Sequence, residues 1–83
     1  MGTRFLLETR FRGAETVASQ LLKHKLVSLG YRYRPMMKLE SGEVENRFQR
    51  FERRATDDDV LGEETERLKS AGVWAGIRTL RLV

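Results

Sequence analysis

Few residues in this 83-residue chain combine in patterns that support catalysis or metal binding. His24 is the only histidine and stands between Lys23 and Lys25. The chain has no cysteine, and one histidine cannot supply the three or four ligands of a zinc site. The consecutive acids of residues 57–59 lack the ligand spacing of a calcium loop. We therefore expect no catalytic residue, no metal site and no cofactor, and a protein that is not an enzyme.

Arginines at alternating positions are the residues that point most clearly to a function. Between Thr3 and Arg12, the aromatic residues Phe5 and Phe11 occupy odd positions, and Arg4 and three other charged residues occupy even ones. A period of two over ten residues is typical of a half-buried strand. The apolar face of this strand must point toward a core, so its arginines are expected on the opposite, open face.

Two further strands are predicted at residues 31–39 and 44–54, joined by a two-residue turn at residues 41–42. Counting back from this turn places Tyr33 opposite Arg50. The resulting register collects the apolar residues of both strands on one face and most arginines on the other. Agreement between register and hydrophobic pattern favours this hairpin.

The same register separates two phenylalanines and pairs two charges. Phe48 lies on the apolar face and Phe51 on the open face, while Lys38 stands opposite Glu45. Pro35 cannot donate a hydrogen bond to a neighbouring strand, so the strand that contains it is expected at a sheet edge or to bulge.

Helical periodicity occurs at residues 14–29, and a second helix is predicted to open with residues 56–59, whose first and last members have capping-box spacing. Gly72 is expected to end the second helix, and residues 77–83 read as a last strand. The order strand, helix, strand, strand, helix, strand predicts an α+β fold of the ferredoxin-like split βαβ type. It would form a single domain over residues 1–83, with a four-stranded antiparallel sheet and two helices on one face.

The apolar stripes of these elements predict one core between the sheet and the helices. Lys25 and Glu64 interrupt the stripes of the two helices, and antiparallel packing of the helices could bring them together as an ion pair. The predicted core consists of Phe5, Leu7, Phe11, Val17, Leu21, Leu29, Tyr33, Phe48, Leu61, Leu68 and Leu80.

The open face of the sheet is the surface predicted to bind a partner. Cations contact phosphates and flat side chains stack on bases, so RNA or single-stranded DNA is one expected partner. Residues 46–53 lack the glycine of the RNA-recognition motif and have only one aromatic residue on this face, so the hypothesis rests on topology and charge. The candidate binding residues are Arg4, Arg10, Arg12, Arg32, Arg34, Lys38, Arg47, Phe51 and Arg53.

A protein interface is the alternative function for the same surface. Leu6, Met36 and Phe51 would lie among arginines and glutamates, an arrangement suited to a two-fold contact between copies of the chain. Such a homodimer, or a complex with another protein, could form through the sheet face or the edge strand at residues 31–39. An ACT-like regulatory module, with a small molecule at the dimer interface, is a variant of this alternative.

Composition sets broad limits on both hypotheses. The chain has 16 Lys and Arg against 12 Asp and Glu, a net charge of +4, and 40% hydrophobic residues. This favours one small, basic domain with a thin core. No apolar run approaches the length of a membrane span, and the N-terminus does not resemble a secretory signal, so a soluble cytoplasmic protein is expected.

Overall fold

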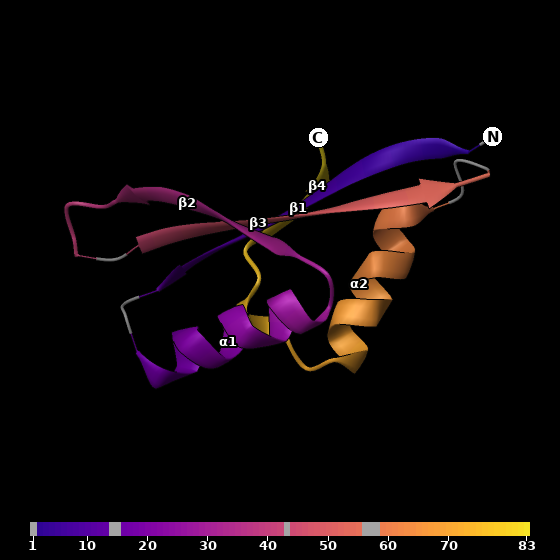
Figure 1. The fold of residues 1–83 in the computed structure, drawn as a ribbon. Helices are drawn as coiled ribbons and strands as arrows, with labels where there is room; N and C mark the ends of the chain where they lie inside the picture. Colours follow the sequence, from indigo (N-terminus) through magenta and orange to yellow (C-terminus); the bar gives the residue numbers. More distant parts are fainter. Residues whose placement is uncertain (1, 14–15, 43, 56–58) are drawn as a thin grey trace.

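The computed structural model describes residues 2–13, 16–42, 44–55 and 59–83 and shows an α+β chain with two layers (Figure 1). A four-stranded antiparallel sheet and two helices are present, which confirms the predicted fold class. In chain order the elements are β1 (Thr3–Gly13), α1 (Val17–Ser28), β2 (Arg32–Lys38), β3 (Val44–Arg54), α2 (Val60–Ser70), the short 3₁₀ helix η1 (Trp74–Gly76) and β4 (Thr79–Leu82).

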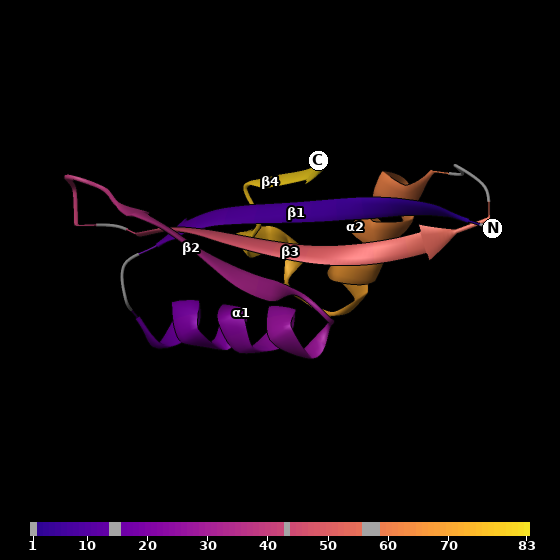
Figure 2. The same ribbon diagram turned by 45° about the horizontal axis from the view of Figure 1, so that its top comes forward.

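The sheet has the strand order β2-β3-β1-β4, and every neighbouring pair is antiparallel. The two central strands pair along their whole length, from Thr3 with Arg54 to Gly13 with Val44, and form a long ribbon (Figure 2). The edge strands are shorter, and β4 pairs only with residues 7–10 of β1. α1 connects β1 to β2, and β3 lies between these two strands in the sheet. α2 connects β3 to β4, and β1 lies between them.

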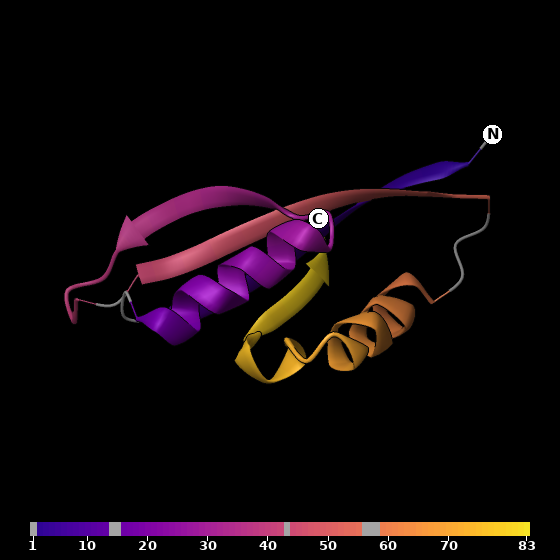
Figure 3. The same cartoon turned by 60° about the horizontal axis from the view of Figure 1, so that its bottom comes forward.

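Both helices lie on the same side of the sheet but under different parts of it. α1 runs beneath β2 and β3, and α2 lies near the far end of the β1–β3 ribbon (Figures 1 and 3). The segment that leads into β4 lies between them in both views. The prediction that the helices pack side by side is therefore wrong, and one flank of α1 is left without a helical neighbour.

Side-chain caps start both helices later than the sequence pattern predicted. The hydroxyl of Thr16 accepts a hydrogen bond of 3.2 Å from the backbone N–H of Ser19, so α1 begins at Val17. The carboxylate of Asp59 accepts one of 3.0 Å from the N–H of Gly62 and caps α2. The predicted capping residue at position 56 and the acids at 57 and 58 lie outside the described residues.

The β2–β3 hairpin forms, but its register differs from the prediction by two residues. Tyr33 lies opposite Phe48, not opposite Arg50, and the pairing shifts between Pro35 and Lys38. The missing N–H of proline explains why the irregularity occurs there. Over residues 32–35 the difference is an even number of residues, so their side chains stay on the predicted faces. At Lys38 the difference is one residue.

The turn contributes to the same shift. The N–H of Gly42 donates to the carbonyl of Leu39 at 3.0 Å, which centres the turn on residues 40–41. Lys38 consequently pairs with Val44, and the predicted placement of Lys38 opposite Glu45 is wrong.

The core lies between the ribbon and the helices and is only partly the predicted one. Leu7, Phe11, Phe48 and Leu68 are buried as expected, whereas Val17 is 77% exposed, Leu21 58% and Tyr33 38%. Of these three residues, Val17 and Leu21 lie on the flank of α1 that no second helix covers. Partly buried residues complete the predicted set, namely Phe5, Leu29, Leu61 and Leu80, and buried residues outside that set are Leu26, Tyr31, Val60 and Val73.

A buried ionic cluster replaces apolar packing where α2 meets the ribbon. The carboxylate of Glu64 is 2.8 Å from the guanidinium groups of Arg50 and Arg67 and accepts a short hydrogen bond from the hydroxyl of Tyr31. Glu64 is only 3% exposed. The predicted pair between Lys25 and Glu64 is therefore wrong, because β3 and α2 themselves supply the arginines.

These contacts determine how the cluster titrates. Burial raises the pKa of Glu64, but hydrogen bonds from Arg67, Arg50 and Tyr31 outweigh burial and lower the pKa from 4.5 to about 2. Burial and the Glu64 carboxylate both raise the pKa of Tyr31. Near neutral pH the cluster therefore contains an ionised Glu64, two cationic arginines and a neutral tyrosine hydroxyl.

The free energy of unfolding is expected to fall in acid. Because Glu64 binds a proton less readily in the folded chain than in the unfolded chain, its contribution of about 3 kcal/mol is complete above pH 4.5. More than half of it is lost as the pH falls from 4.5 to about 3. Urea unfolding followed through Trp74 fluorescence measures this loss, and Glu66→Gln, an exposed change on the same helix, should leave the acid loss unaltered. If Glu64→Gln lost as much unfolding free energy in acid as the natural chain, Glu64 would not be the group responsible for the loss.

Candidate functional site

The open face of the sheet consists of cross-strand rows of side chains fixed by the strand pairing. Arg4 of β1 lies opposite Arg53 of β3, and the next row contains Leu6 and Phe51. Three further rows continue toward the hairpin end of the ribbon, the last of which contains Arg12 and Glu45. Successive rows are about 7 Å apart, because side chains on one face recur every second residue.

The third row of this largely cationic face contains a buried carboxylate. Glu8 is 1% exposed and accepts hydrogen bonds from Arg10 at 2.6 Å, Gln49 at 2.9 Å and Arg81 at 3.1 Å. Burial raises the pKa of Glu8, but the hydrogen bonds from these three side chains outweigh burial and lower it. Glu8 therefore remains ionised and fixes Arg10 and Arg81 in place. Arg32 completes the row opposite Gln49.

The fourth row brings three arginines side by side. Arg34 of β2 lies opposite Arg47 of β3, which lies opposite Arg10 of β1. Side chains directly opposite each other in antiparallel strands have Cβ atoms about 5 Å apart, and like charges at that distance are destabilising. Among the described residues, only Arg10 of this row has an acidic partner, Glu8. The Nε atom of Arg47 is buried and has no hydrogen-bond partner in the described part of the chain.

An aromatic contact lies beside the cations at the other end of the face. The guanidinium carbon of Arg4 is 3.8 Å from the centre of the Phe51 ring, a cation–π geometry. Phe51 remains 51% exposed. Its ring and the guanidinium plane of Arg4 together provide a flat surface on which another ring could stack.

A small polar hollow extends the face toward β4. It has a volume of about 130 Å³ and is lined by Arg10, Glu45, Arg78, Thr79 and Arg81. Arg12 lies 3.9 Å from the carboxylate of Glu45, one of the lining residues. Three arginines against one glutamate make this hollow cationic.

The structure brings most predicted site residues together on this one face. Arg4, Arg10, Arg12, Arg32, Arg34, Arg47, Phe51 and Arg53 all occupy it. Lys38 pairs through its backbone, and its side chain lies outside the described part of the structure. Sequence reasoning missed Gln49 and Arg81, which hold Glu8. The alternation of Thr79, Arg81 and Leu80 in the last strand was the signal that could have placed Arg81 on this face.

The other groups considered for chemistry show no metal-binding arrangement within the described residues. His24 is exposed on α1. Residues 2–13, 16–42, 44–55 and 59–83 contain no group of three His, Cys, Asp or Glu side chains able to hold a metal ion. Within the same ranges, no helix is both long enough and apolar enough to cross a membrane.

Comparisons with known proteins add no relative to this description. No family model matches the chain, and neither the curated proteins nor the solved structures contain a match. The functional argument therefore rests on the open face itself.

Proposed function

We propose that the chain is a non-enzymatic module that binds RNA or single-stranded DNA on the open sheet face. The observation that carries the proposal is the row of Arg34, Arg47 and Arg10 across three strands. Adjacent like charges reduce stability unless an anion lies among them, and a phosphate group is an anion that arginine binds well. Arg47, with an unpartnered Nε, is the centre of this row.

The spacing of the face supports a linear polyanion as the partner. The arginine pair Arg4–Arg53 and the row that contains Arg10 are six residues apart along β1, a distance of about 20 Å. Phe51 and Leu6 lie between the cations. Phosphates of one strand could contact both basic rows while a base stacks near Phe51.

The proposal includes the ferredoxin-like form of the fold. Read from β4, the strand order is β4-β1-β3-β2, and each helix connects two parallel strands that flank a third. This is the connection that the split βαβ arrangement requires. It leaves one sheet face free of helices, as the proposed binding mode needs. The cytoplasmic location expected from the sequence remains a prediction.

Binding to a labelled pool of short single-stranded RNA and DNA tests the proposal. We expect affinity to fall as salt rises from about 50 to 200 mM, with a slope of log K against log salt of about −0.7 per phosphate contacted. Duplex DNA of the same length should bind more weakly, because its bases cannot reach Phe51. Fluorescence anisotropy measures both affinities.

Replacement of Phe51 with alanine separates stacking from charge. It should weaken binding by about 1–3 kcal/mol and leave the salt slope unchanged. No binding at low salt would overturn the proposal. If light scattering then showed a dimer that dissociates in Phe51→Ala, the face would be a protein interface instead.

A further inference from the structure

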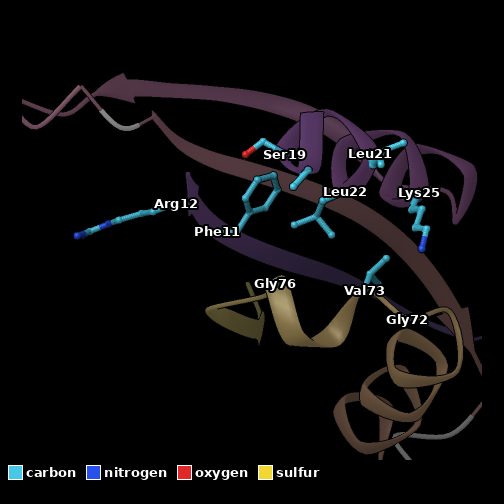
Figure 4. Close-up of a pocket in the computed structure, with 10 residues that line it drawn as sticks. Phe11, Arg12, Ser19, Leu21, Leu22, Lys25, Gly72, Val73 and Gly76 are labelled. Atoms are coloured by element: carbon cyan, nitrogen blue, oxygen red, sulfur yellow. The ribbon is translucent and has the colours of Figure 1, made fainter. Parts of the chain in front are cut away.

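An apolar groove separates α1 from the segment that follows α2, on the side of the molecule opposite the arginine rows. Its volume is about 390 Å³, within the range of about 300–1,000 Å³ that small-molecule sites occupy. Phe11, Leu22 and Val73 contribute apolar walls (Figure 4). The groove exists because α2 does not pack beside α1.

The backbone of η1 approaches α1 closely at one end of this groove. A Cβ atom at Gly76 would lie 2.7 Å from a methyl carbon of Leu22, so only glycine allows this approach without displacing that side chain. Trp74, the only tryptophan of the chain, belongs to the same short helix and packs against the core. Its fluorescence can therefore report on occupancy of the groove.

The charge at the groove is asymmetric. Lys25 reaches from α1 toward Gly72 at one end, and its ammonium nitrogen would be 3.8 Å from a Cβ at that glycine (Figure 4). Among the described residues Lys25 has no acidic partner. Arg12 also lines the groove, and its guanidinium nitrogen lies 3.9 Å from the carboxylate of Glu45. The site therefore combines apolar walls with two cations, of which Arg12 has an acidic partner and Lys25 has none among the described residues.

We propose that this groove binds an apolar molecule that carries one carboxylate, such as a medium-chain alkyl acid. The chain of the ligand would lie against Phe11, Leu22 and Val73, and its carboxylate would pair with the Lys25 ammonium. Leu21, 58% exposed at the rim, would lose contact with water on binding. This site is independent of the arginine rows and of the nucleic-acid proposal.

Titration with sodium decanoate below its micelle concentration tests the site. We expect a saturable change in Trp74 fluorescence at one ligand per chain. Decanol, which lacks the charge, should bind about fivefold more weakly. Lys25→Met should remove the preference for decanoate and leave decanol binding unchanged. Lys69→Met, which deletes an exposed lysine of α2, should keep the preference.

A second variant tests the position of the ligand. Ala18 lines the groove, and Ala18→Leu should lower decanoate affinity about tenfold by filling the space of two or more methylenes. Leucine is a good helix former, so circular dichroism should show an unchanged fold. The proposal is overturned if decanoate does not saturate, if Ala18→Leu binds as tightly as the natural chain, or if a second copy covers the groove and Ala18→Leu separates the dimer.

Discussion

Replacing Glu64 with glutamine is expected to lower the free energy of unfolding by about 3 kcal/mol, a large part of the stability of a domain this small. The substitution keeps the shape of the side chain but removes the charge between Arg50 and Arg67. Arg50 is largely buried, with 16% of its side chain exposed, and would keep only Glu52, 2.8 Å away, as an acidic partner. Urea unfolding at pH 7 measures the change.

Two comparisons identify the origin of that loss. Glu66→Gln removes an exposed glutamate, 74% accessible, from the same helix and should change stability by less than about 0.5 kcal/mol. The double variant Arg50→Met with Glu64→Leu should be more stable than the sum of the single changes predicts, by about 1–3 kcal/mol. Equal effects of Glu64→Gln and Glu66→Gln would show that the cluster does not hold α2.

Part of this cluster could be predicted from the sequence. The register that places Phe48 inside also places Arg50 on the helix-facing side of β3, where an arginine needs a carboxylate. Glu64, an acid in an apolar stripe, was recognised as unusual. Its partner was misassigned because periodicity describes one helix at a time and does not give the position of α2 relative to the ribbon.

The open face was predicted more accurately than the core. A strand has a period of two, so an error of two residues in the β2–β3 register moved no described side chain to the other face. A helix wheel indicates which side of α1 is apolar but not what covers it. Val17 and Leu21 were therefore assigned to a core that the position of α2 leaves open.

Replacing Arg34 and Arg47 together with glutamine is expected to weaken single-strand binding by about 10- to 100-fold at low salt. Each lost phosphate contact removes about 0.7 from the salt slope, so the slope should shrink by about 1.4. Folding should respond in the opposite direction. Because Arg34, Arg47 and Arg10 are neighbours in one row, removing two charges relieves repulsion, and stability should stay constant or rise by up to about 1 kcal/mol.

A variant with the same net charge isolates the effect of position. Lys25→Gln with Lys69→Gln also removes two positive charges, but from the helices, and should leave affinity and salt slope nearly unchanged. Lower affinity together with unchanged or higher stability is expected when residues are arranged for binding at the expense of folding. If both double variants bind alike, net charge alone attracts the strand, and the row at Arg47 is not the phosphate site.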